Sequence, residues 1–142
     1  SITLNVWTHI SFCLDFSLSS GSRGKIFING VDATSADSMN QTSINTSGGG
    51  LRIGARDISS LLPFTGLIDE SAIWSGTDQR ANVSEIYGGG VAVDLNALAT
   101  APNPTTWYRM GDGDTVPTIQ DKNGSANLTM TNFSTFSSDV PT

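Results

Sequence analysis

The chain has 142 residues, a formal net charge of −6 and a sequence pI near 4.3, and only 14% of its residues are charged. Ser, Thr, Gly and Asn supply 19, 16, 15 and 10 residues, while eleven of the thirteen acids are Asp. This composition excludes a helical bundle and favours an all-β domain with many loops. The seven Lys and Arg residues form no cluster, which argues against a nucleic-acid partner, and no apolar run approaches the ~18 residues of a membrane span.

The longest strand pattern spans residues 5–18. Apolar or β-branched side chains occupy every second position from Val6 to Phe16, which predicts a strand with that face on a core. The other face carries His9 and Cys13, the only residues of their types. We expect a structural role for the histidine and a buried, inert thiol for the cysteine.

A hairpin is predicted next. Residues 25–28 and 31–34 form two short strand patterns around Asn29-Gly30, and this dipeptide favours a two-residue turn because both residues tolerate positive φ. Residues 35–50 are polar and predict a long loop.

Two further strands are predicted in the middle of the chain. Residues 51–55 alternate between apolar and other side chains, and residues 64–74 are apolar except for Asp69, Glu70 and Ser71. We expect the second segment to be a central strand that is buried on much of both faces.

One short helix is predicted after Asn82, the N-cap, and before Gly88, the stop. Strands at residues 105–110 and 126–133 follow, separated by a loop over residues 111–123. Short strands with Gly and Asn turns between them predict an antiparallel β-sandwich of the jelly-roll type with one short helix.

Five segments, in this order, resemble the laminin-G-like jelly roll of the concanavalin A-like lectin/glucanase superfamily. They are WTHISF (7–12), IFINGV (26–31), LRIGAR (51–56), FTGLIDESAIW (64–74) and EIYGGG (85–90). The resemblance implies one laminin-G-like domain over residues 1–142, in a superfamily that includes both lectins and glycosidases.

The tail from Trp107 to Pro141 is similar to the ends of laminin-G-like proteins in marine bacteriophages. In bacterial relatives such a segment usually opens the domain, whereas here it follows the other strands. The resemblance therefore implies a fragment whose N-terminal strands lie upstream in a longer chain or in a neighbouring one. It also implies a homo-oligomeric virion protein.

The spacing of the acids argues against an enzyme. A retaining glycosidase needs two carboxyl groups about 5 Å apart that face the same sugar. Asp69 and Glu70 are adjacent, so a strand would direct them to opposite faces, and Ala72 and Ile73 add no second acid on either face. We expect this pair to anchor backbone amides or to bind calcium.

Calcium is the one cofactor that the composition suggests, because it takes six to eight oxygen ligands. Asp112-Gly113-Asp114 offers two carboxylates, and the segment from Asp121 to Ser125 begins as an Asp-x-Asn-Gly loop. The candidate metal ligands are Asp112, Asp114, Asp121, Asn123 and Glu70. The alternative is a pair of Gly/Asp turns with solvated carboxylates.

Exposed aromatic rings stack on the apolar face of a sugar. Alternation along a strand would turn either Trp107 or Tyr108 outward, so we predict these two as ligand contacts, together with Asp57 in a rim loop. Trp7 and Trp74 belong to the core motifs of the resemblance and are expected to pack inside.

These observations predict a non-enzymatic recognition module on a virion surface or an extracellular protein. Its partner would be a glycan or a cell-surface receptor bound by loops at the rim of the sandwich. The alternative is a structural virion component, such as a capsid decoration, fibre or tail protein, that contacts capsid or tail proteins.

Overall fold

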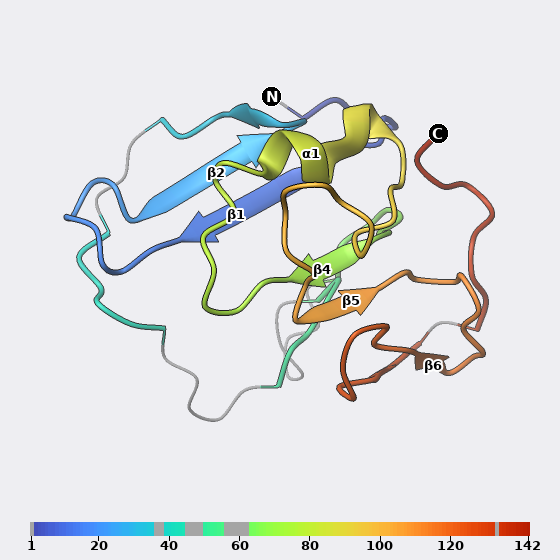
Figure 1. Cartoon of the computed structure of the whole chain (residues 1–142). Helices are drawn as coiled ribbons and strands as arrows, with labels where there is room; N and C mark the ends of the chain where they lie inside the picture. Colours follow the sequence, from blue (N-terminus) through green and yellow to red (C-terminus); the bar gives the residue numbers. More distant parts are fainter. Residues whose placement is uncertain (1, 36–38, 45–49, 56–62, 133) are drawn as a thin grey trace.

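A computed structural model describes residues 2–35, 39–44, 50–55, 63–132 and 134–142. In these residues, short antiparallel strands form three small sheets, and one α-helix lies on one side of the strands (Figure 1). The strands are β1 (Ile10–Leu14), β2 (Gly24–Ile28), β3 (Val31–Asp32), β4 (Ser71–Ile73), β5 (Thr106–Tyr108), β6 (Thr118–Ile119) and β7 (Leu128–Thr129). The helix is α1 (Val83–Tyr87), and the 3-10 turn η1 (Gly88–Gly90) follows it. The predicted all-β antiparallel class with one short helix is confirmed, and no described helix has the length and apolarity that crossing a bilayer requires.

The first sheet has the order β1-β2-β3. Ile10 lies opposite Ile28, and the predicted hairpin turn is present, with φ of 49° at Asn29 and 77° at Gly30. β1 is shorter than the predicted strand over residues 5–18. Asn5, with φ 59°, turns the chain before it, and the Asp15 side chain accepts the Ser17 N–H in a turn after it.

The helix α1 begins after Asn82 and ends at Gly88, as predicted, and Gly88 adopts φ 60° and donates its N–H to the Glu85 carbonyl. The predicted N-cap residue Asn82 makes no side-chain cap bond. The Glu85 carboxylate instead accepts backbone N–H groups from Ala99, Thr100 and Ala101, which ties the following loop to the helix.

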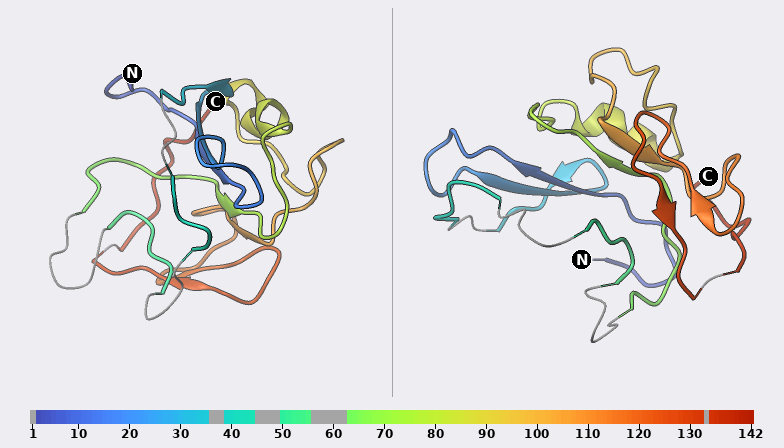
Figure 2. Two further views of the ribbon diagram at one scale, coloured as in Figure 1. Left: turned by 90° about the vertical axis from the view of Figure 1, so that its left-hand side faces the viewer. Right: turned by 90° about the horizontal axis from the view of Figure 1, so that it is seen from below.

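The two sides of α1 pack against two different sheets. Val83, only 1% exposed, packs with Cys13 of β1 and Phe27 of β2. Ile86 packs in a second cluster with Trp107 of β5. Figure 2 shows the result in its right-hand view, where α1 lies on one side of the strands and the segment of residues 50–55 lies on the other. The predicted burial of the cysteine is confirmed.

The middle of the chain departs from the prediction. Residues 51–55 contribute only an isolated bridge between Ala55 and Pro63, and β4 is the only part of 64–74 that pairs as a strand. Glu70 adopts φ 49°, which interrupts an extended run and delays pairing until Ser71. The segment before it is exposed, with Phe64 at 58%, so the predicted burial on both faces is wrong.

Val83→Ala should lower the free energy of unfolding by about 2 kcal/mol, because it opens a cavity where α1 meets the first sheet. Ser84→Ala, at an exposed position of the same helix, is the matched control and should change it by less than about 0.5 kcal/mol. Urea unfolding followed by circular dichroism measures both. Equal values for the two variants would contradict the packing described here.

Candidate functional site

The two aromatic residues predicted as ligand contacts are buried. Trp107 is 3% exposed and Tyr108 is 1% exposed. The indole Nε1 donates to Glu70 Oε2 at 2.6 Å, and the phenol donates to the Ala126 carbonyl. The predicted exposure of one ring is wrong, because β5 is covered on both faces. Asp57 lies outside the described residues.

Asp121 holds the C-terminal segment together. It is buried, and its carboxylate accepts backbone N–H groups from Trp107 at 3.0 Å and from Asn123 and Ala126. Burial opposes its ionisation, but these amides prevail and hold the pKa of Asp121 below its usual range. Asn123 donates to the Pro104 carbonyl and exchanges amide hydrogen bonds with Asn96. Both residues are therefore structural anchors.

The other two predicted loop ligands also have protein partners. Asp114 has a fully buried side chain that accepts the N–H groups of Gly111 and Gln120. Asp112 is 59% exposed on its side chain and pairs with Arg109 Nη2 at 2.6 Å.

Glu70 lies at the centre of a small polar cluster. Its carboxylate accepts from the Trp107 indole and from Arg109 Nε at 3.1 Å, and the guanidinium lies 5.2 Å from the centroid of the indole ring. Burial raises the pKa of Glu70 in spite of these bonds, and burial also raises the pKa of neighbouring Asp69. The predicted role of Glu70 as an anchor for backbone amides is wrong, because its carboxylate accepts from two side chains instead.

The five predicted metal ligands do not converge. The described part of the chain holds no group of three or more His, Cys, Asp or Glu side chains placed to share a metal ion. Each carboxylate already has donors from the protein, so the residues present do not fit a calcium cage. Calcium stays a prediction from the sequence alone.

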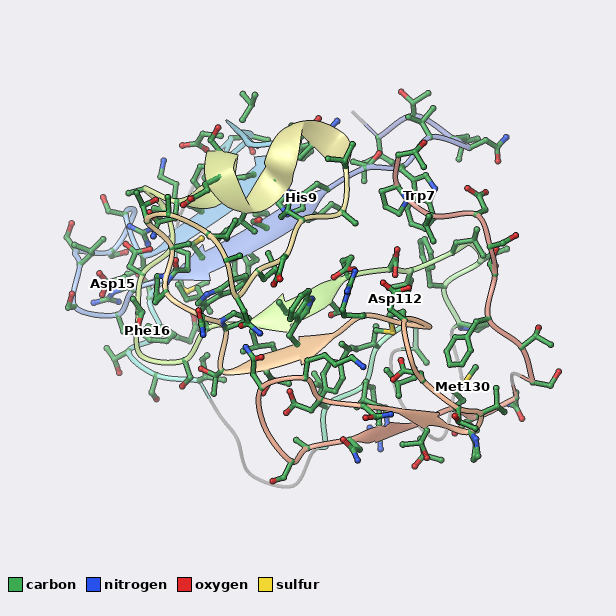
Figure 3. All side chains as sticks on the ribbon, turned by 45° about the vertical axis from the view of Figure 1, so that its right-hand side comes forward. Trp7, His9, Asp15, Phe16, Asp112 and Met130 are labelled. Atoms are coloured by element: carbon green, nitrogen blue, oxygen red, sulfur yellow. The ribbon has the colours of Figure 1, made fainter. Side chains whose placement is uncertain are left out.

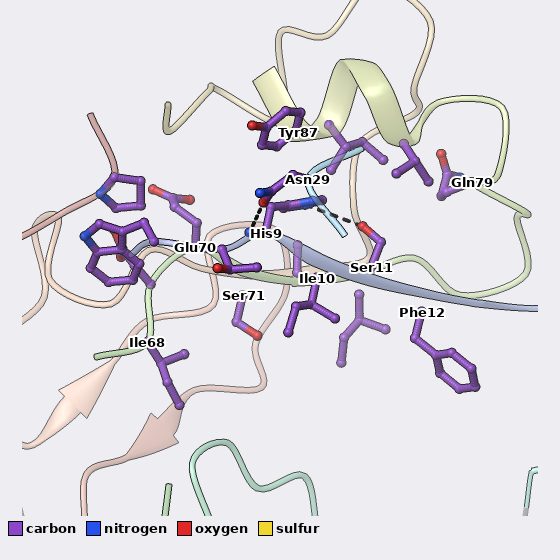
Figure 4. Close-up of a pocket in the computed structure, with 18 of the residues that line it drawn as sticks. His9, Ile10, Ser11, Phe12, Asn29, Ile68, Glu70, Ser71, Gln79 and Tyr87 are labelled. Carbon is purple, nitrogen blue, oxygen red and sulfur yellow. Dashed lines mark hydrogen bonds between the residues drawn. The ribbon is translucent and has the colours of Figure 1, made fainter. Parts of the chain in front are cut away.

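A hollow of about 1470 Å³, which the sequence did not predict, lies against β1 and β4. Every residue of β1 and of β4 lines it, and the segment from Phe64 to Glu70 contributes as well. In Figure 4, Ile10 and Phe12 point away from Tyr87, on the same side as Ile68 and Ser71. Ile10 and Phe12 are each 57% exposed, so one wall of the hollow is open apolar surface.

The opposite side of β1 is polar and lies beneath α1. His9 Nε2 lies 3.4 Å from Ser11 Oγ, and the Asn29 side chain accepts the His9 backbone N–H (Figure 4). The imidazole packs against Tyr87 with ring centroids 5.5 Å apart. Burial lowers the pKa of His9, so the ring is neutral at pH 7, and within the described residues its Nδ1 has no hydrogen-bond partner.

The N-terminal segment and the C-terminal segment meet at one end of the hollow. Trp7 Nε1 donates to Asp139 Oδ1 at 3.1 Å, and both residues line the hollow. Figure 3 shows Trp7 beside the C-terminal part of the chain and His9 below the helix. Trp74, which was predicted to pack inside, contacts the cluster around Trp107 and donates to the Pro102 carbonyl.

The period-2 pattern of β1 did identify the residues of the open face. Ile10 and Phe12 fall on the predicted apolar side, but that side does not rest on a core in the described residues. The buried side is the one that carries Cys13. The sequence could reveal an apolar face but not which face α1 covers.

A comparison with family models matches residues 1–84 to the family described as the concanavalin A-like lectin/glucanases superfamily. The match covers more than half of the 142 residues. The comparisons with curated proteins and with solved structures give no match.

Asp121→Asn should lower the free energy of unfolding by about 1–2 kcal/mol at pH 7, because the neutral amide is a weaker acceptor for three backbone N–H groups. The folded pKa lies below the unfolded value near 3.9. The stabilisation from the ionised carboxylate is therefore present above about pH 4 and is lost as the pH falls through the folded pKa.

Urea unfolding of the unmodified chain and of Asp121→Asn between pH 7 and pH 3 measures this effect. The difference between their free energies of unfolding should shrink toward pH 3. Asp112→Asn is the control at an exposed ion pair and should cost less than about 1 kcal/mol. If the free energy of unfolding that Asp121→Asn loses is the same at every pH, the ionised Asp121 carboxylate is not the stabilising group.

Added Ca²⁺ or a chelator should shift the thermal midpoint by less than about 1 °C, because the candidate carboxylates are already bonded within the protein. Differential scanning fluorimetry with Mg²⁺ as the control measures the shift. A rise with Ca²⁺ alone that follows its concentration would restore the predicted calcium site.

Proposed function

We propose, on the premise that the chain belongs to the concanavalin A-like lectin/glucanases superfamily, that it is a non-enzymatic recognition module. The hollow between β1 and β4 carries this proposal. Its β1 wall exposes Ile10 and Phe12, and apolar surface of this kind beside polar groups is typical of sites that bind another molecule. The module therefore binds its partner in the hollow.

The placement of the acids supports binding rather than hydrolysis. Glu70 is engaged by the Trp107 indole and the Arg109 guanidinium, so its carboxylate is not free to act on a bound sugar. Asp69, its neighbour in sequence, is the other acid of the pair and lines the same hollow. A glycosidase needs one free acid and one free carboxylate flanking the bond, and this pair does not supply them.

The chemistry of the wall favours a protein over a glycan as the partner. Sugar sites combine flat exposed rings with dense hydrogen-bonding groups, whereas the most exposed side chains of β1 in this hollow are Ile10 and Phe12, and the exposed Ile68 lies on the same side. The two rings suited by sequence to stacking, Trp107 and Tyr108, are buried. We place the module on a virion surface or in an extracellular protein, since the tail from Trp107 onward resembles that of phage proteins.

The same exposed wall also favours the second candidate, a structural virion component. A half-exposed Phe12 beside Ile10 would be buried permanently if the chain contacted a capsid or tail protein during assembly. In both settings the partner is a protein and the contact surface is the wall of the hollow.

Parallel screens of the purified chain against a random-peptide display library and a glycan array test the proposed function. We expect peptide ligands whose affinity falls about tenfold or more in Phe12→Thr, because this change removes the largest apolar side chain of β1 and introduces a β-branched residue that suits a strand. Val31→Thr, on the far edge of the same sheet, should leave the affinity unchanged.

Binding of a coherent sugar class without peptide ligands would make the chain a lectin. Turnover of an oligosaccharide would contradict the non-enzymatic assignment.

A further inference from the structure

Among the described strands, the backbone of β1 has one free edge. Asn29 N donates to His9 O, and Asp15 N donates to Arg23 O, so the odd-numbered residues of β1 are those that exchange hydrogen bonds with β2. In an antiparallel pair the even-numbered residues then direct their N–H and C=O groups to the other edge. No strand in the described part of the chain pairs with that edge.

The free edge and the apolar face belong to the same residues. Ile10, Phe12 and Leu14 are the even positions of β1, and the first two are more than half exposed. A strand that paired with this edge would continue the sheet and extend its apolar face. The backbone and the side chains of β1 therefore favour the same kind of partner, which is an extended segment with apolar residues at alternate positions.

The β1 edge also lacks the usual protection against pairing. Edge strands of free sheets are short, charged or interrupted by Pro or a bulge. β3, the opposite edge of this sheet, follows that rule, because it has two residues and Asp32 pairs with Lys25 at 2.9 Å. β1 has five residues, Ile-Ser-Phe-Cys-Leu, with no charge and no Pro.

The hollow beside the free edge of β1 is also bounded by β4. Among the described strands, β4 pairs with β5 alone. Their arrows point the same way in Figure 1, and the views of Figure 2 agree that β4 lies beside β1. A segment that runs antiparallel to β1 would therefore also run antiparallel to β4.

The charges that line the hollow are all acidic in the described residues. Lining acids lie beyond both ends of the two strands: Asp15 after β1, Asp78 after β4, Asp69 before β4, and Asp139 beside Trp7 before β1. Glu70 is the fifth; it pairs with Arg109, and Asp78 pairs with Arg80 at 3.6 Å. Acids at both ends of an apolar edge complement a segment with a basic residue at each end.

We infer that the hollow accepts an extended segment of another polypeptide, which adds as a strand to the edge of β1 and has alternate apolar side chains and basic ends. This inference rests on the proposed recognition function and names the class of partner. The backbone of the segment bonds to Ile10, Phe12 and Leu14, its apolar side chains extend their face, and its basic ends approach Asp15 and Asp139.

A synthetic peptide of about nine residues, with valine and threonine alternating between lysine ends, tests the inference, because it spans β1 and reaches one acid beyond each end. Isothermal titration of the full chain should give saturable one-to-one binding. The same peptide with a central proline should not bind, and the version with glutamate ends should bind at least about tenfold more weakly.

Phe12→Thr should weaken binding of the lysine-ended peptide about tenfold, whereas Val31→Thr should not change it. Circular dichroism confirms that each variant is folded. Equal binding of the proline and parent peptides would overturn strand addition.

A concentration-dependent dimer of the chain that is lost in Phe12→Thr, with no peptide bound, would also overturn the inference and assign the edge to a second copy. Peptides from the display library that bind through Phe12 but are helical or acidic would refute this inference and leave the recognition function intact.

Discussion

The packing of α1 between two sheets is the contact on which the rest of the structure depends. One side of the helix is anchored by Val83 against β1 and β2, and the other by Ile86 against the cluster that contains Trp107. A helix of five residues has little stability of its own, so these contacts and the Gly88 cap hold it. Because the helix spans both sheets, it also sets how β1 and β4 lie beside each other.

The same packing decides where the molecule is open. With α1 on one side of the strands, Cys13 and Phe27 are buried while Ile10 and Phe12 are exposed on the other side. A sheet with one covered face and one open apolar face exposes hydrophobic surface to water, and that surface borders the free edge of β1. Function therefore depends on this hollow, because the fold itself serves many different activities.

Local chemistry in the sequence predicted much of the fold. Asn29-Gly30 determined the hairpin through its tolerance of positive φ, and Gly88 determined the end of the helix. Strand lengths were overestimated, because Asn5 and Glu70 adopt positive φ values that composition does not reveal. A residue such as Glu, which has no local preference for that region, adopts it where tertiary contacts hold it, as the Trp107 and Arg109 bonds hold Glu70.

The candidate site was less predictable than the fold. Period-2 alternation correctly grouped Ile10 with Phe12, but it cannot tell which face a distant helix will cover. The Gly/Asp loops had the composition of a cation site, yet Asp121 and Asp114 are used as acceptors for backbone amides. Such long-range acceptor roles depend on chain segments that meet only after folding, and sequence spacing does not encode them.

Amide hydrogen exchange of the isolated chain, resolved by residue along β1, tests the central claim most directly. An edge strand paired on one side should show alternating protection, with slow exchange at Ser11 and Cys13, which bond to β2, and fast exchange at Ile10, Phe12 and Leu14. Uniformly slow exchange at all five residues of β1 would mean that a strand already occupies the edge, and it would contradict the open hollow.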